Sequence, residues 1–312
     1  MAYIRRFEQV VQSLFQRGSI MGSIHLCMGQ EAVSTGLCSV LQRDDLVAAT
    51  YRGHAASLAL GTDPFRLLAE MLGREPGVCG GRAGSMNIID REHQLVGCFG
   101  IVGGSIAAAT GVGLALKQKG AGVAIAIFGD GAVNSGYFHE CLNFACVTKL
   151  PIVYICENNQ YAEFSSVEAM TAGGILPRAR AFGIKSEAVD GMDVWAVREA
   201  AYRAVADSRS GNGPSFLEAR TYRYNDHARG DPLEYRREGE MEAWRDRDPL
   251  LSARKRLVEE YKMTVEELDD IQSDVSDAID AVRLAALDAP KPHITPLDGL
   301  EFKSSARATN RG

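Results

Sequence analysis

Two short apolar runs joined by one helical segment limit what this chain can fold into more than any other feature. The runs 123–128 and 151–156 are partly β-branched and have the length of buried strands, and residues 135–147 between them carry apolar side chains at helical spacing. A strand, a helix and a second strand in this order form a right-handed crossover with the two strands parallel in one sheet. The sequence therefore predicts an α/β architecture.

The same alternation recurs along the chain. We expect a strand at 185–189, a helix at 194–208 and a strand at 215–219, and the small-residue segment 105–117 indicates a further helix. Repeated alternation predicts a doubly wound, mostly parallel sheet with helices on both faces. Residues 221–248 interrupt it with charges of both signs, a composition typical of a solvated loop followed by a polar helix.

Helices are also expected at both ends of the chain. Residues 1–18 have the pattern of an amphipathic helix, and two helical stretches are predicted at 249–261 and 265–287. A length of 312 residues suits one large or two ordinary domains. We interpret residues 1–300 as a single α/β domain and residues 301–312 as a tail.

Composition excludes several classes of protein. The chain has 34 Lys and Arg against 40 Asp and Glu, a net charge of −6, which argues against a broad surface for nucleic acid or anionic membrane. No apolar run reaches the roughly 18 residues that span a bilayer, and the N-terminal segment lacks the core of a signal peptide. The 7 cysteines include no C-x-x-C pair, so we expect reduced side chains and a cytoplasmic location.

Polar motifs follow both strands of the first crossover. Gly129-Asp130-Gly131 comes directly after one strand, and Asn159 lies 29 positions beyond Asp130, just after the next. Both should reach the carboxyl edge of the sheet, where α/β folds bind phosphate. A carboxylate there repels phosphate unless a cation lies between them, and carboxylate, amide and carbonyl oxygens are ligands that Mg²⁺ or Ca²⁺ prefers.

Either motif alone is compatible with a plain turn or loop, but the pair at this spacing favours a diphosphate and metal site. A nicotinamide site is a weaker interpretation because GDGAVN (129–134) lacks the third glycine of that fingerprint. A Walker-type loop is absent from the sequence.

The GDG…ENN pair resembles the thiamine diphosphate motif, and the wider chain resembles one family of enzymes. From about Gly22 to Leu250 it is similar to the α subunit of the first component of 2-oxo acid and acetoin dehydrogenase complexes. The segments that carry the resemblance are HLCMGQEA (25–32), ATYRGH (49–54), GGRAGSMN (80–87), GIVGG (100–104), GDGAVNSGYFHE (129–140), KLPIVYICENNQYAE (149–163) and RTYRYNDHARGDP (220–232). The resemblance implies a thiamine diphosphate-binding fold with Mg²⁺ as the second cofactor.

The resemblance also assigns individual residues to the metal and the diphosphate. It implies that Asp130 and Asn159 hold Mg²⁺, together with the main-chain carbonyl of Tyr161. Gly131 and Ala132 would then lie beside the diphosphate.

Further cofactor contacts are implied on the opposite side of the site. Tyr51 and Arg52 would bind diphosphate oxygens, a task that suits a guanidinium. An arginine is also costly to bury without an anion, so a phosphate partner accounts for Arg52. Gly100 and Val102 would line the pocket of the aminopyrimidine ring.

Two histidines are expected to act at the site. By the resemblance, His227 lies on the loop over the diphosphate and His25 approaches the substrate, so both are expected catalytic residues. The alternative for His25 is a structural histidine at the start of a helix, and His54 could either reach the site or pack. The remaining histidines are expected to be structural or exposed: His93, His139 and His293.

The sequence departs from the mitochondrial pyruvate enzymes that it resembles. Those enzymes have a histidine where Asn225 stands and a regulated serine where Ala228 stands, so phosphorylation at that position is impossible here. The segments GIVGG, FHE and NNQYAE are closer to acetoin-type relatives.

The resemblance implies that the chain is inactive alone. In this family a β subunit supplies the glutamate that binds the aminopyrimidine, so we expect two α and two β chains. The implied reaction is attack on the carbonyl of a small-molecule substrate, loss of carbon dioxide from a 2-oxo acid or of acetaldehyde from acetoin, and transfer of the acyl group to a lipoyl-bearing second component. The sequence does not choose between these substrates.

Three other functions stay open at this point. A transketolase-like half enzyme would use the same cofactor, and a non-catalytic structural subunit would use none. A nicotinamide-dependent dehydrogenase is the third.

Overall fold

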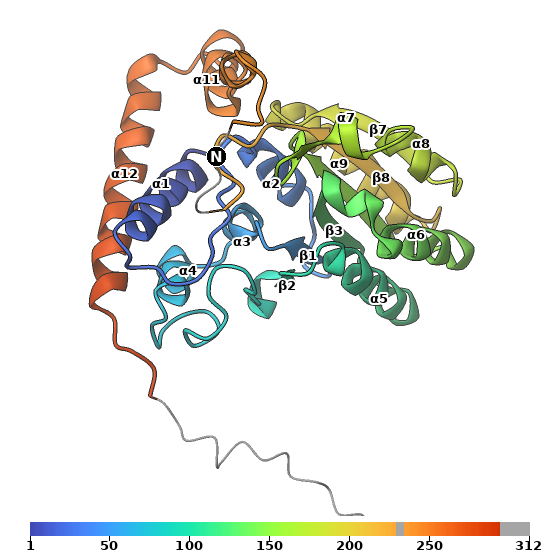
Figure 1. Ribbon diagram of the computed structural model, residues 1–312, viewed down its shortest axis with the longest axis horizontal. Coiled ribbons are helices and arrows are strands. Elements are labelled where there is room, and N and C mark those ends of the chain that lie inside the picture. Colours follow the sequence, from blue (N-terminus) through green and yellow to red (C-terminus); the bar gives the residue numbers. More distant parts are fainter. Residues whose placement is uncertain (229–233, 294–312) are drawn as a thin grey trace, which may run out of the picture.

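A six-stranded sheet forms the centre of the protein, which is described by a computed structural model for residues 1–228 and 234–293 (Figure 1). The strand order is β2-β1-β3-β4-β8-β7, and every neighbouring pair is parallel. The strands are β1 (Leu46–Thr50), β2 (Leu95–Phe99), β3 (Ala124–Gly129), β4 (Ile152–Asn158), β7 (Lys185–Asp190) and β8 (Ser215–Arg220). The predicted doubly wound α/β fold is confirmed, while the predicted tail 301–312 lies outside the described residues.

Helices cover both faces of this sheet because side chains along each strand alternate between two apolar clusters. On β3, Ile125 and Ile127 belong to the apolar cluster that includes residues of α1, α2, α4, α9 and α12, whereas Ala126 and Phe128 belong to the cluster that includes residues of α5, α6 and α8. The helices are α1 (Ala2–Gln16), α2 (Glu31–Cys38), α3 (His54–Leu60), α4 (Pro64–Met71), α5 (Gly104–Lys119), α6 (Gly136–Thr148), α7 (Val167–Met170), α8 (Ile175–Arg180), α9 (Val194–Arg209), α10 (Glu240–Arg245), α11 (Pro249–Glu259) and α12 (Val265–Asp288).

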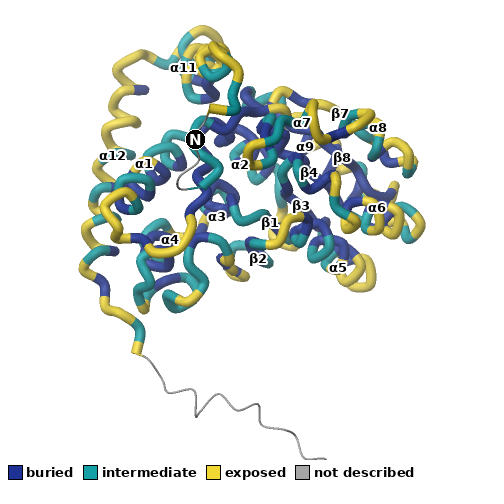
Figure 2. The backbone as a smooth tube through the Cα atoms, in the orientation of Figure 1, coloured by how far each residue is buried: buried dark blue, intermediate teal, exposed yellow. Residues whose placement is uncertain are grey.

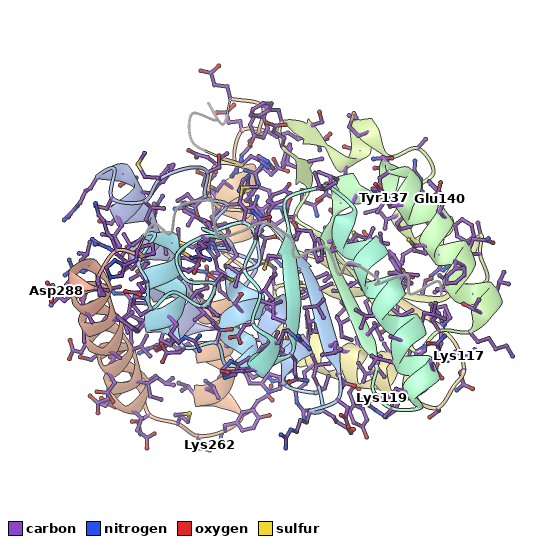
Figure 3. The ribbon with its side chains drawn as sticks, turned by 90° about the horizontal axis from the view of Figure 1, so that it is seen from below. Lys117, Lys119, Tyr137, Glu140, Lys262 and Asp288 are labelled. Carbon is purple, nitrogen blue, oxygen red and sulfur yellow. The ribbon has the colours of Figure 1, made fainter. Side chains whose placement is uncertain are left out.

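Local sequence explains how several helices begin and end. Asp193 and Asp248 cap α9 and α11 by accepting hydrogen bonds from backbone amides, and Thr264 forms a capping box with Glu267 at the start of α12. The last turn of α5 carries two lysines labelled in Figure 3, where positive charge complements the helix dipole. Figure 2 shows buried strands at the centre and exposed outer surfaces on α11 and α12.

The strand order creates a crevice at one edge of the sheet. β2, the next strand in the sequence after β1, lies on one side of β1 in the sheet. The strand after that, β3, lies on the other side of β1. Crossovers that diverge in this way leave an opening at the carboxyl ends of the two strands, where ligands bind in open α/β sheets. The predicted crossover from β3 to β4 is also present, and it pairs Gly129 with Glu157.

Two smaller elements complete this edge. A 3-10 helix, η2 (Asp130–Asn134), follows β3, and a two-stranded hairpin of β5 (Tyr161–Ala162) and β6 (Ser165–Ser166) follows β4. A second 3-10 turn, η1 (Arg91–His93), precedes β2. Within the two described stretches, no helix combines the length and apolar character needed to cross a membrane.

Candidate functional site

A cavity of about 260 Å³ lies at the carboxyl ends of β1, β3 and β4. It collects most of the residues that the sequence predicts for a cofactor site. The predicted residues that line it are Tyr51, Arg52, Val102, Asp130, Gly131, Ala132, Asn159, Tyr161 and His227. Gly100 and His25 do not line it: Gly100 lies near Met86 and Asn87, and the ring of His25 contacts the rings of Tyr51 and His227.

Asp130 is a buried carboxylate with one oxygen left unbonded. Its side chain lies where β3 passes into η2, it is 2% exposed, and Oδ2 has no hydrogen-bond partner among the described residues. Burial raises the pKa of Asp130 to about 6, against the opposing effect of nearby backbone amides and of Arg223 and Arg52. An unbonded buried carboxylate oxygen costs free energy, so a cation in the cavity would fit this side chain.

Asn159 and Tyr161 face the same cavity from the turn after β4. Gln160 between them has a φ of 77°, a left-handed conformation that reverses the chain toward β5. The side-chain Oδ1 of Asn159 accepts a hydrogen bond from the backbone amide of Tyr161 at 3.3 Å. Within residues 1–228 and 234–293, no cluster of three His, Cys, Asp or Glu could hold a metal, so a cation here would depend on amide and carbonyl oxygens. Mg²⁺ and Ca²⁺ accept such ligands.

Gly131 is required by a close approach between η2 and β5. A Cβ atom at Gly131 would lie 2.8 Å from the Cβ of Ala162, well inside van der Waals contact. A side chain at this position would therefore push the hairpin away from Asp130. The absence of a side chain at Gly131 therefore allows η2 and β5 to lie in contact beside the cavity.

Two buried guanidinium groups give this region positive charge. Arg52 is 7% exposed, donates to the carbonyl of Leu26, and makes no ion pair with any described residue. Burial lowers the pKa of Arg52, and the nearby Arg223 lowers it further. Arg223 is fully buried and donates to the carbonyl oxygens of Asn225 and Glu163 at 3.0 and 2.9 Å. An anion in the cavity would compensate this charge.

Two aromatic rings that line the cavity, those of Tyr51 and His227, contact the ring of His25. The ring centroid of His25 lies 4.4 Å from Tyr51 and 5.0 Å from His227, and Tyr51 lies 6.0 Å from His227. His25 is 6% exposed, and its Nδ1 has no hydrogen-bond partner among the described residues. Burial, followed by the charge of Arg52, lowers the pKa of His25 to about 3, so this ring is neutral near pH 7.

His54 differs from these histidines because it packs away from the cavity. Its two ring nitrogens lie 2.6 Å from Glu8 Oε1 and 2.8 Å from Ser85 Oγ, and the side chain is completely buried. His54 does not line the cavity. Of the two roles that the sequence left open for it, the structure favours packing.

Sequence reasoning missed several residues of this site. Glu157 lines the cavity and burial raises its pKa to about 7, although the nearby Arg52 opposes that shift. Gln30 lines it from the start of α2. Arg223 does not line the cavity, but its positive charge lowers the pKa of Asp130 against the effect of burial. Each of these three residues lies within a segment that carries the family resemblance. The sequence therefore indicated the segment but not the individual residue. The other unpredicted lining residues are Thr50, Gly103, Ser105, Phe128, Gly129, Ala162 and Glu163.

Comparison with known proteins agrees with this geometry. Residues 1–295 match the family described as "Dehydrogenase E1 component". The pyruvate dehydrogenase E1 component subunit alpha of Porphyra purpurea is 39% identical over 302 residues, which cover 94% of this chain and 88% of that protein. The corresponding subunit of Rhizobium meliloti is 40% identical, covering 95% of this chain and 86% of that protein. The alpha subunit of acetoin:2,6-dichlorophenolindophenol oxidoreductase from Bacillus subtilis is 39% identical, covering 94% and 88%. The chain belongs to the dehydrogenase E1 component family.

Proposed function

We propose that this chain is the α subunit of a thiamine diphosphate-dependent dehydrogenase first component. With a β subunit it cleaves a 2-oxo acid or acetoin and passes the acyl group to a lipoyl-bearing second component. Family membership implies thiamine diphosphate and a β partner. The relatives named for pyruvate and for acetoin support these two substrate classes. The observation that carries the proposal is the buried Oδ2 of Asp130, which has no partner among the described residues, in a cavity that is also lined by Arg52, which forms no ion pair with any of them.

The metal in this proposal is Mg²⁺. Asp130, Asn159 and the main-chain carbonyl of Tyr161 would hold it, since carboxylate, amide and carbonyl oxygens are ligands that Mg²⁺ accepts. The buried Oδ2 of Asp130 and the proximity of Asn159 Oδ1 to the backbone of Tyr161 support this set of ligands. Gly131 and Ala132 let the backbone approach the diphosphate.

The rest of the cofactor is bound by residues after β1 and β2. Tyr51 and Arg52 bind the diphosphate oxygens, and Gly100 and Val102 contact the aminopyrimidine. Val102 is half exposed and lines the cavity, as expected for an apolar side chain that a ring would cover. When bound, thiamine diphosphate would supply a nucleophilic carbon, and these residues would hold and orient it.

The two histidines shape the reaction side of the cavity. His227 lies over the diphosphate, and His25 approaches the substrate. Because its lowered pKa keeps His25 neutral, this residue carries no positive charge, and in the tautomer with hydrogen on Nδ1 it donates a hydrogen bond from that atom. A neutral donor can orient a carbonyl or carboxylate without adding to the repulsion from Arg52.

The proposal includes an assembly of two α and two β chains, in which the β subunit supplies the glutamate that binds the aminopyrimidine. Residues 1–300 form one thiamine diphosphate-binding domain in this view. We place the enzyme in the cytoplasm, in agreement with its seven free cysteines.

Thermal unfolding of the chain, alone and with its β subunit, tests the proposal. Thiamine diphosphate plus Mg²⁺ should raise the unfolding temperature because a ligand that binds the native state stabilises it. The shift should appear with the β subunit present and should vanish in Asp130→Ala. No shift in any combination would favour a structural subunit. If a shift is found, turnover of pyruvate, branched 2-oxo acids and acetoin then identifies the substrate.

A further inference from the structure

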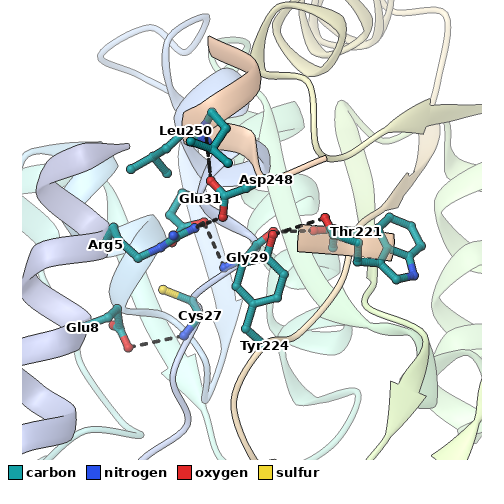
Figure 4. A network of polar contacts seen from close by, with 11 residues as sticks. Arg5, Glu8, Cys27, Gly29, Glu31, Thr221, Tyr224, Asp248 and Leu250 are labelled. Carbon is teal, nitrogen blue, oxygen red and sulfur yellow. Dashed lines mark hydrogen bonds and ion pairs between the residues drawn. The ribbon is translucent and has the colours of Figure 1, made fainter. Parts of the chain in front are cut away.

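The backbone on either side of Gln30 is held in place by several contacts (Figure 4). Gly29 has a φ of 96°, and a Cβ there would lie 2.3 Å from the carbonyl oxygen of Tyr222. The amide of Gly29 donates to Glu31 Oε2 at 2.9 Å, and its carbonyl accepts from Thr221 Oγ1 at 2.9 Å. Gln30 therefore begins α2 from a fixed position, and its side chain enters the site between β4 and the segment after β8.

Gln30 contacts the carboxamide of Asn159 in an orientation that the neighbouring backbone determines. Asn159 Oδ1 accepts from the amide of Tyr161 at 3.3 Å, so the nitrogen of the carboxamide must face the other way. That nitrogen, Nδ2, donates to Gln30 Oε1 at 3.1 Å. A carboxamide can be turned by 180° with little change in shape, and here Gln30 and Tyr161 together select one of its two orientations.

This arrangement leaves the amide nitrogen of Gln30 without a partner. Gln30 is 1% exposed, and its Nε2 has no hydrogen-bond acceptor among the described residues. A buried donor without an acceptor costs free energy, and native proteins rarely keep one without a reason. Gln30 lines the same cavity as Asp130 and Arg52, so an anionic oxygen bound there is the acceptor that this donor lacks.

We propose that Gln30 is a further cofactor-binding residue with two roles, an inference that rests on the proposed function. Its Oε1 keeps the oxygen of Asn159 available for the metal, and its Nε2 donates a hydrogen bond to an oxygen of the diphosphate. The two roles belong to two different atoms of one side chain. Substitutions can therefore separate them.

Two variants of the α chain, each assembled with the β subunit, make that separation. Gln30→Met keeps the length of the side chain and removes both hydrogen-bonding atoms. Gln30→Glu keeps an acceptor for Asn159 and replaces the donor by a second acceptor. Gln272→Met, on the exposed side of α12, is the matched control. The measurements are the Kd of thiamine diphosphate at saturating Mg²⁺, the Mg²⁺ concentration for half-maximal binding, and the unfolding temperature without cofactor.

For Gln30→Met we expect a Kd for thiamine diphosphate raised roughly tenfold or more, the cost of losing a hydrogen bond to a charged group. Its Mg²⁺ requirement should rise as well, while the unfolding temperature without cofactor stays close to that of the wild type and of Gln272→Met. Gln30→Glu should keep a wild-type Mg²⁺ requirement and still bind thiamine diphosphate weakly. A purely structural role would not raise the Kd in both variants while raising the Mg²⁺ requirement in Gln30→Met alone.

Other outcomes would overturn the inference. A wild-type Kd in Gln30→Met or in Gln30→Glu would remove the donor to the diphosphate, and a wild-type Mg²⁺ requirement in Gln30→Met would remove the role toward Asn159. A raised Mg²⁺ requirement in Gln30→Glu would remove the role toward Asn159. Failure of the proposed function itself is distinguishable, because the wild-type complex would then show no binding of thiamine diphosphate at all.

Discussion

Two buried polar clusters in this protein differ in how their hydrogen bonds are satisfied. In the first, which we call the packing cluster, His54 lies between Glu8 and Ser85, and both of its ring nitrogens have a partner. The second oxygen of Glu8 accepts from the backbone amide of Cys27 at 3.3 Å. In the cavity, Asp130 Oδ2 and Gln30 Nε2 have no partner among the residues that the structure describes.

The difference distinguishes side chains whose hydrogen bonds are made within the protein from side chains that we propose to bind the cofactor. A carboxylate, a histidine and a serine in hydrogen-bond contact are the parts of a nucleophilic triad. In the packing cluster, however, all three side chains are buried and none lines the cofactor cavity. Its contacts join α1, α3 and the segment before β2, whereas Asp130 and Gln30, whose free polar atoms have no partner in the described part of the chain, line one cavity. Residue types alone would not distinguish the two.

The largest effect is expected from breaking the packing cluster. His54→Leu leaves the carboxylate of Glu8 buried without its histidine, which should lower the free energy of unfolding by roughly 3 kcal/mol. The unfolding temperature of the assembled protein should fall by roughly 5 to 10 °C, measured by differential scanning fluorimetry. His139→Leu on the exposed side of α6 is the control. A change equal to that of the control would show that the cluster does not hold the fold.

The opposite behaviour is expected when the unpaired cation of the cavity is removed. Arg52→Met deletes a buried charge that has no ion-pair partner among the described residues, so the unfolding temperature without cofactor should stay level or rise. The Kd of thiamine diphosphate should rise roughly 10- to 100-fold, as measured by titration at saturating Mg²⁺.

Arg209→Met provides the matched control for Arg52. Its guanidinium pairs with the buried Asp45 at 2.7 Å, so its loss should lower stability and leave cofactor affinity unchanged. If Arg52→Met lost stability in the same way and kept its affinity, Arg52 would belong with the packing cluster.

The sequence predicted those parts of the fold in which apolar periodicity marks a strand, a helix and a second strand in succession. The crossover from β3 to β4 and the unit β7–α9–β8 are confirmed close to their expected bounds. The strands β1 and β2 were not predicted, although they carry the residues before Tyr51 and Gly100. Leu46–Thr50 is five residues long and contains two alanines, so its strand conformation depends on pairing with β2 on one side and β3 on the other.

The site was predictable to the extent that its residues directly follow strands. Asp130 and Asn159 do so, and the structure brings both to one cavity. Gln30 and Arg223 were missed because their roles depend on contacts between segments far apart in the sequence. Gln30 lies 129 positions from Asn159, and no local pattern indicates that the two side chains meet.

The smallest expected effect concerns His25, which contacts Tyr51 and His227 of the cavity and whose buried Nδ1 has no hydrogen-bond partner within the described stretches. Burial and Arg52 lower its pKa to about 3, so the folded protein keeps it neutral where the unfolded chain, with a histidine pKa near 6.5, binds a proton. Acid therefore favours the unfolded state, and the contribution of His25 to stability is lost as the pH falls from about 6.5 toward 3. Replacing it by His25→Gln should make the unfolding temperature less sensitive to a change from pH 7 to pH 5, whereas His139→Gln should keep the wild-type dependence. If the unfolding temperatures of His25→Gln and the wild type changed equally between pH 7 and pH 5, His25 would be protonated in the folded protein as readily as in the unfolded chain. His25 would then differ from Asp130 and Gln30, whose burial carries a cost in free energy.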